Sequence, residues 1–157
     1  MSEQAPHTRI AQVHLQAARN VARMQEVAYE RDVAVRDLIE SGEFALPEAV
    51  GPYVLNLTMD GQRMHLSVVA ADDSAHMLSL PVSAFRRLIK DYFLICESHI
   101  EATKWAHTEH LQTLDMARRS IHNEAAELMK SLLDSKATMD FNTARRIFTL
   151  MCVLHIA

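Results

Sequence analysis

Three pairs of adjacent arginines lie in the second half of the chain, each flanked by apolar residues. They occur in the segments 85–89 (FRRLI), 117–121 (ARRSI) and 144–148 (ARRIF). Six guanidinium groups beside apolar helix faces need carboxylates, phosphates or water as partners, because burying an unpaired charge is costly. These arginines are therefore the residues of the sequence best suited to bind an anion.

The densest polar cluster surrounds the second pair. Asp115, Arg118 and His122 are three and four residues apart, so a helix places them on one face. In a functional interpretation, Arg118 binds an anion and His122 transfers protons near neutral pH, with Glu124 or Glu97 orienting the imidazole. In a structural interpretation, the same residues form an ion pair that sets the register of packed helices. The sequence leaves both interpretations open.

The third pair, Arg145 and Arg146, falls in the first two turns of the last predicted helix, where free backbone N–H groups already favour anions. Their partner is then an external anion or a carboxylate of the chain, with Asp91, Glu97 and Glu124 as candidates. Alternatively, Asp140 caps this helix and the arginines pair internally. The candidate ligand-binding residues are Arg118, Arg119, Asn123, Arg145, Arg146 and Asp91.

Other chemistry has little support. His107 and His110 are three residues apart and His99 is nearby, but no complete metal-binding motif contains them. The chain has three glycines and no glycine-rich phosphate-binding motif. We therefore predict neither a metal nor a cofactor. Cys96 and Cys152 lie in apolar helical patterns, which is typical of buried free thiols.

Size and charge limit the class of protein. The 157 residues fit one domain, 1–157, with residues 1–7 as a disordered tail. No apolar run approaches the ~18 residues that cross a bilayer, and the start of the chain lacks the apolar core of a signal peptide. The formal net charge of -4 disfavours nucleic acid. We therefore expect a cytoplasmic protein without membrane association, whose partner is a protein or a small anion. A homodimer through an apolar patch near Val21 and Met24 is one alternative.

Hydrophobic periodicity predicts the elements. Alternation over 11–15 indicates a strand, and helical spacing over 26–39 indicates a helix that stops before Gly42. Two alternating runs joined by Asp60-Gly61 predict a β-hairpin over 53–69, and a further strand follows over 76–80. Three helices are expected after Pro81, over 84–103 with Ser83 as its cap, from 108 to about 134, and from about 140 onward.

The last of these helices is apolar almost all round and is predicted to be the most enclosed. The order of elements predicts an α+β fold, in which a small antiparallel sheet of about four strands packs against a C-terminal three-helix layer and one N-terminal helix.

Three long segments, 85–98, 115–124 and 140–155, carry a resemblance to a known family. The chain resembles an uncharacterised family of small alphaproteobacterial proteins, often encoded near histidinol dehydrogenase. The resemblance implies a bacterial cytoplasmic setting and no established activity. Where that family tends to carry glycines, this chain has Ala117, Ser120 and Ala125, which favours a continuous helix over a phosphate-binding loop.

The lack of a catalytic motif favours a non-enzymatic regulatory or adaptor module that binds a protein or a small anion through its internal arginines. The alternative is a small enzyme that acts on a phosphorylated or carboxylated metabolite, with His122 as acid and base and Arg118 and Arg145 holding the anion. A third hypothesis, nucleic-acid association through the exposed arginines, is opposed by the net charge.

Overall fold

The computed structural model describes residues 6–16, 25–105 and 108–156. Its helices are α1 (Gln25–Ser41), α2 (Arg86–Trp105), α3 (Thr108–Leu132) and α4 (Phe141–Ile156), with short 3-10 helices at η1 (Pro6–Thr8) and η2 (Val82–Phe85). Its strands are β1 (Ile10–Gln16), β2 (Phe44–Ala45), β3 (Tyr53–Met59), β4 (Arg63–Val69), β5 (Ala75–Pro81) and β6 (Thr138–Met139). The α+β class predicted from the sequence is confirmed.

The main sheet has four strands in the order β1-β3-β4-β5. β3, β4 and β5 are joined antiparallel, whereas β1 runs parallel to β3. The sheet is therefore mixed, and the prediction of a wholly antiparallel sheet is wrong on this point. A parallel pair needs a long crossover, and α1 supplies it here. A second sheet pairs β2 with β6. It was missed because two-residue strands leave no alternating pattern.

The turns between strands follow from local chemistry. Gly61 has a φ of 96°, a value that glycine adopts without steric cost. The Asp60 carboxylate accepts hydrogen bonds from the backbone N–H groups of Gln62 and Arg63, at 3.0 and 2.8 Å. Asp73, with a φ of 66°, closes the turn between β4 and β5. The predicted hairpin is confirmed.

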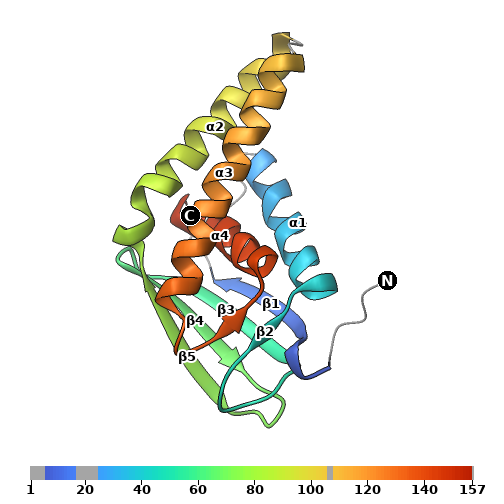
Figure 1. Ribbon diagram of the computed structural model, residues 1–157, viewed down its shortest axis with the longest axis vertical. Coiled ribbons are helices and arrows are strands. Elements are labelled where there is room, and N and C mark those ends of the chain that lie inside the picture. The colour runs from blue at the N-terminus through green and yellow to red at the C-terminus, as the bar shows by residue number, and fades with distance from the viewer. Residues whose placement is uncertain (1–5, 17–24, 106–107, 157) are drawn as a thin grey trace.

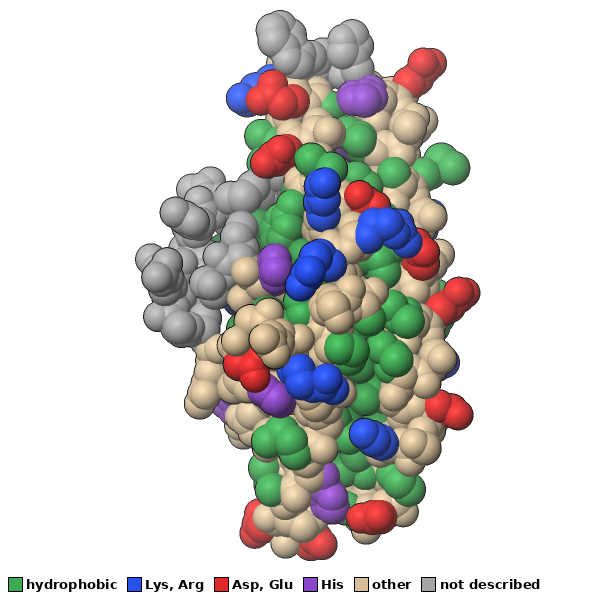
Figure 2. Space-filling view, turned by 90° about the vertical axis from the view of Figure 1, so that its left-hand side faces the viewer, with side chains coloured by type: hydrophobic (Ala, Val, Ile, Leu, Met, Phe, Trp, Pro, Cys, Tyr) green, Lys and Arg blue, Asp and Glu red, His purple; other side chains and the backbone are tan. Residues whose placement is uncertain are grey.

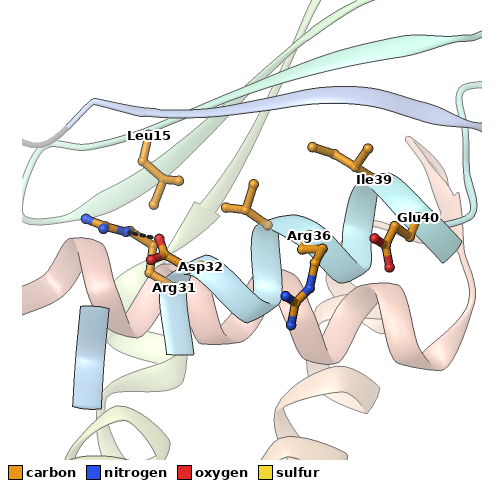
Figure 3. A pocket seen from close by; sticks show the side chains of 7 residues that line it. Leu15, Arg31, Asp32, Arg36, Ile39 and Glu40 are labelled. Atoms are coloured by element: carbon orange, nitrogen blue, oxygen red, sulfur yellow. Dashed lines mark hydrogen bonds and ion pairs between the residues drawn. The ribbon is translucent and has the colours of Figure 1, made fainter. Parts of the chain in front are cut away.

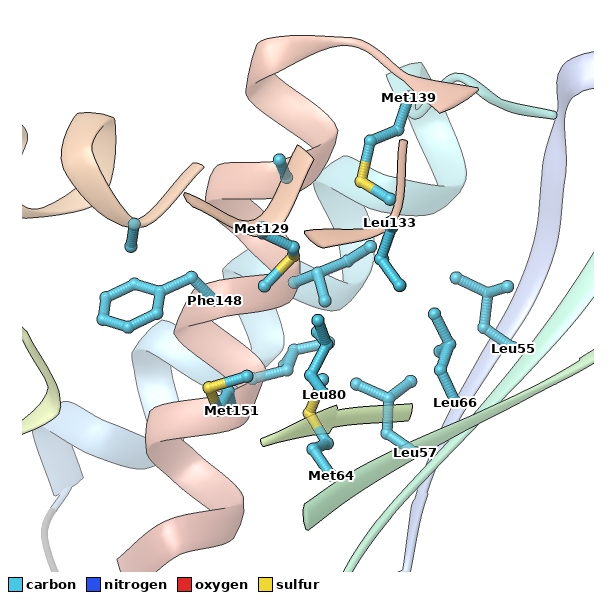
Figure 4. Close-up of a cluster of buried hydrophobic side chains, with 14 of the residues drawn as sticks. Leu55, Leu57, Met64, Leu66, Leu80, Met129, Leu133, Met139, Phe148 and Met151 are labelled. Carbon is cyan, nitrogen blue, oxygen red and sulfur yellow. The ribbon is translucent and has the colours of Figure 1, made fainter. Parts of the chain in front are cut away.

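The helices cover one face of the sheet, where α1 packs on β1 and α4 packs against α1, α3 and the sheet (Figure 1). Inward side chains of β3 and β4, among them Leu57 and Leu66, meet Phe148 and Met151 of α4 in a continuous apolar core (Figure 4). Residues 147, 148 and 150–153 are almost inaccessible to solvent, as the sequence predicted for this helix. Cys152 is a buried free thiol whose pKa is raised by burial.

Two of the predicted caps can be compared with the structure. Asp140 caps α4, because its carboxylate accepts a 2.8 Å hydrogen bond from the backbone N–H of Thr143. The Thr143 hydroxyl accepts a 2.9 Å bond from the N–H of Glu43, which ties the start of α4 to the segment before β2. Ser83 is not the cap of α2. Ser83 lies inside η2, the 3-10 helix that precedes α2. The N-terminus of η2 itself has no side-chain cap.

α2 and α3 form a long antiparallel pair that extends beyond the sheet (Figure 1). On the face shown in Figure 2, Lys and Arg side chains are spread from the far end of this pair towards the sheet, with hydrophobic side chains among them. Of the helices that the structure describes, none is long and apolar enough to cross a membrane. Residues 1–5 of the predicted tail, and Val21 and Met24 of the predicted patch, lie outside the described residues.

Candidate functional site

A polar pocket of about 270 Å³ opens where α1, α3 and α4 come together. We call it the arginine pocket. It is lined by Glu30, Asp115, Arg118, Arg119, His122, Arg145 and Arg146. The second and third arginine pairs, separated by 25 residues of chain, thus lie in one pocket, because α3 packs along α4. The first pair is not part of its lining.

Arg118 holds two helices together at this pocket. Its guanidinium is 2.8 Å from the carboxylate of Glu30 on α1 and 3.4 Å from that of Asp115 on α3. The Glu30 side chain is only 19% exposed, so this ion pair is partly desolvated and matters for the packing of α1. Glu30 was not predicted, since it lies 88 residues away from Arg118 in the sequence.

Arg146 is also satisfied within the protein, by a partner that differs from the prediction. Its guanidinium is 3.0 Å from the carboxylate of Asp37 on α1. The predicted partners Asp91 and Glu124 instead both pair with Arg87, at 3.3 and 2.6 Å. A third predicted partner, Glu97, is exposed on α2.

The other two arginines of the pocket, Arg119 and Arg145, form no ion pair with any residue that the structure describes. Arg145 has only a long contact of 3.5 Å to the side-chain oxygen of Asn142. Its Nε is buried and has no hydrogen-bond partner among the described residues. Burial and then the charges of Arg146 and Arg119 lower the pKa of Arg145. The pocket therefore has an excess of positive charge.

His122 forms the inner wall of the pocket and is 7% exposed. Its Nδ1 lies 2.8 Å from the backbone carbonyl of Arg118, and its Nε2 lies 3.1 Å from the hydroxyl of Thr149. The ring packs edge-on against Tyr92 and Phe148, with centroids 5.5 Å apart in both cases. The pKa of His122 is lowered to about 4, chiefly by burial; the hydrogen bond to the Arg118 carbonyl opposes this shift, and the charges of the nearby arginines contribute to it.

The hydrogen bonds decide the tautomer of His122. A backbone carbonyl only accepts, so Nδ1 carries the proton. In the neutral ring, Nε2 can then only accept, and the single proton of the Thr149 hydroxyl is shared between Nε2 at 3.1 Å and the backbone carbonyl of Arg145 at 3.2 Å. Both ring nitrogens are thus used inside the protein, and the ring is neutral at pH 7. This geometry fits the structural interpretation of His122 better than proton transfer to a ligand.

Comparison with known proteins places the chain in a family. A family model described as an uncharacterised protein family, UPF0262, matches residues 7–157. The chain belongs to the UPF0262 family. The resemblance stated from the sequence is thereby confirmed for the family, whereas the proximity to histidinol dehydrogenase genes stays a prediction.

The relatives of this UPF0262 chain match it over most of their length. A UPF0262 protein of Paramagnetospirillum magneticum is 41% identical over 154 residues, which cover 96% of this chain and 98% of that protein. A relative from Sphingopyxis alaskensis is 43% identical, with coverages of 94% and 93%. One from Rhizobium etli is 44% identical over 134 residues, with coverages of 83% and 84%. No solved structure matches the chain.

The remaining predicted residues of the UPF0262 chain lie outside the arginine pocket. Asn123 is half-buried on α3, and its side-chain oxygen has no hydrogen-bond partner in the described part of the chain. Asp91 of α2 and Glu124 of α3 both pair with Arg87 of α2, far from the loop that joins the two helices. Within residues 6–16, 25–105 and 108–156, no group of three His, Cys, Asp or Glu residues is placed to hold a metal ion.

A larger hollow of about 560 Å³ lies between β1 and α1 (Figure 3). Its floor is apolar and consists of Leu15, Val35 and Ile39. Arg31 and Asp32 at one end of it are paired with each other at 3.1 Å. The two hollows therefore differ in chemistry: the larger one has an apolar floor, whereas four arginines converge on the smaller one.

Proposed function

We propose that the arginine pocket binds a small phosphorylated or carboxylated anion, and that the protein is a cytoplasmic binding module of a regulatory kind. The observation that carries this proposal is that Arg119 and Arg145 face one pocket without a carboxylate partner among the described residues. The other two arginines of the pocket are already neutralised by Glu30 and Asp37. A bound anion would supply the missing charge.

The chemistry of Arg145 supports an oxyanion as the ligand. A guanidinium presents parallel N–H groups that match two oxygens of a carboxylate or phosphate. Its buried Nε has no acceptor among the described residues, and an unsatisfied buried donor is costly. An oxyanion in the pocket would accept from this group and from Arg119 on the facing helix.

The size of the pocket favours a small ligand. Pockets for drug-sized molecules occupy about 300–1,000 Å³, whereas this one has about 270 Å³. Inorganic phosphate, a phosphorylated small metabolite or a dicarboxylate fits this volume.

The enzyme alternative has less support from the geometry. Catalysis near neutral pH needs an acid or base with a pKa near that range, and burial holds the pKa of His122 at about 4. Asp115, the exposed carboxylate of the pocket, lies 3.4 Å from Arg118 and 4.0 Å from His99. Glu124 and Glu97 do not line the pocket. Binding without proton transfer therefore agrees best with the residues present.

The test is isothermal titration of the purified protein with inorganic phosphate, sugar phosphates and dicarboxylates. We expect saturable binding of at least one of these classes. Arg119→Ala and Arg145→Gln should each weaken it by roughly tenfold or more, since hydrogen bonds to charged groups contribute about 1.5–3 kcal/mol. The control is Arg87→Ala, which removes an arginine outside the pocket that pairs with Glu124. It should leave the affinity unchanged.

Two results would contradict the proposal. One is the absence of a binding signal for every anion at millimolar concentration in the wild-type protein. The other is equal weakening by Arg87→Ala, which would indicate general electrostatic attraction instead of a pocket. Arg118→Ala is less informative here, because Arg118 also holds Glu30 and its loss affects folding.

A further inference from the structure

We propose that the outer edge of β5 pairs with the same edge of a second copy of this chain, so that two four-stranded sheets form one continuous sheet of a homodimer. β5 is the last strand in the order β1-β3-β4-β5 and lies along the margin of the sheet away from β1 (Figure 1). This inference does not depend on the arginine pocket.

The ladder between β4 and β5 shows which backbone groups point outward. Val82 donates to Gln62, and Ala70 donates to Ser74, each at 2.9 Å. The register between these two residue pairs is regular. Because hydrogen-bonded and non-hydrogen-bonded residue pairs alternate along an antiparallel ladder, the backbone groups of the even-numbered residues of β5 bond to β4. The odd-numbered residues Ala75, Met77, Ser79 and Pro81 therefore direct their backbone groups away from the sheet. None of these groups is bonded to a residue that the structure describes.

The two edge strands of the sheet, β1 and β5, differ in whether they carry features that block pairing with another strand. Exposed edges invite pairing with another chain, and proteins commonly block them with bulges, charges or covering segments. At β1, the register is broken by an irregularity between Ile10 and Gln12, and Arg9 is bridged to Glu43 beside it. β5 has neither device from Ala75 to Ser79, and its proline, Pro81, stands at the last position of the strand. Its sequence AHMLSLP holds no Lys, Arg, Asp or Glu, its register is regular, and Met77 is 65% exposed.

A second copy is the occupant that fits this edge best. When two β5 strands run antiparallel about a two-fold axis at Met77, Met77 faces Met77 and Ala75 faces Ser79 of the other copy. All three outward N–H donors then meet C=O acceptors. Pro81, which lacks an N–H, falls outside these pairs. The same arrangement brings the acidic turn at Asp72 and Asp73 of one copy towards the Arg63 end of the other, so the charges at the two ends of the edge are complementary.

The first measurement is the molar mass of the wild-type protein by light scattering over a range of concentrations. We expect the mass to approach twice 17.8 kDa. Met77→Lys places two like charges on the two-fold axis and should return the mass to that of one chain. The matched control is Met116→Lys, because Met116 is 69% exposed on α3, away from the sheet. This control should still form the dimer.

Cross-linking tests the register. Facing residues of a hydrogen-bonded antiparallel pair have Cα atoms about 5.5 Å apart, which suits a disulfide. Both native cysteines are buried, so Met77→Cys introduces the reactive thiol. It should form a covalent dimer roughly a hundredfold faster than Met116→Cys, owing to the effective concentration within the dimer.

Either of two results would overturn the proposal. One is a wild-type mass of one chain at all concentrations. The other is a dimer that survives Met77→Lys, together with cross-linking of the Met77→Cys variant that is no faster than that of the Met116→Cys control.

Discussion

The stability of this protein should depend on pH through His122, and the size of the effect follows from its surroundings. Burial lowers the pKa of this imidazole from 6.5 to about 4. In the unfolded chain the ring is exposed and binds a proton below about pH 6.5. Between these two values the unfolded state holds a proton that the folded state does not. The folded state is therefore destabilised as the pH falls from 6.5 to about 4, and is unaffected by this group above that window.

The magnitude can be worked out from the two pKa values. Each pH unit between them is worth 1.36 kcal/mol, so the difference between 6.5 and about 4 corresponds to about 3 kcal/mol of unfolding free energy. This is a substantial share of the 5–15 kcal/mol that is typical of folded proteins.

The assay is urea unfolding, followed by circular dichroism at several pH values from 7.5 to 4.5, of the wild type and of His122→Gln. Subtracting the two profiles removes the contribution of the other eight histidines. We expect the stability advantage of the wild type to shrink by about 2–3 kcal/mol over this range. His110→Gln, an exposed histidine on the same helix, controls for the general loss of an imidazole. Parallel profiles for wild type and His122→Gln would refute the reasoning.

Three further predictions concern the interactions around the pocket and the core. Arg118→Met should lower the unfolding free energy by about 2 kcal/mol, because it leaves the mostly buried Glu30 carboxylate without its 2.8 Å partner. Glu30→Gln, which retains a hydrogen-bond acceptor, should cost less in the same urea experiment. Asp140→Ala removes the cap of α4 and should cost about 1 kcal/mol by thermal unfolding, whereas Asp140→Asn should cost little. A thiol reagent should modify neither Cys96 nor Cys152 in the native protein, since both side chains are buried. It should modify both in denaturant. Rapid labelling of the native protein would contradict this prediction.

Much of the architecture could be predicted from local patterns along the chain. Alternation over 53–69 with Asp60-Gly61 at its centre predicts a hairpin, because the turn conformation is a property of those two residues. The nearly continuous apolar run after Ile147 predicts an enclosed helix, and α4 is that helix. The spacing of Asp115, Arg118 and His122 predicts a shared helix face, and all three line one pocket. Each of these inferences needs only residues close together in sequence.

The tertiary structure alone decided which distant groups meet. The parallel pairing of β1 with β3, the partner of Arg118 on α1 and the partner of Arg146 at Asp37 all join segments far apart in the chain. The sequence showed that His122 was ionisable, but its pKa depends on burial against Tyr92 and Phe148. Local patterns specify the elements because backbone geometry repeats over a few residues. Ion-pair partners and pKa values depend on distances and solvent exposure that exist only after the elements have packed.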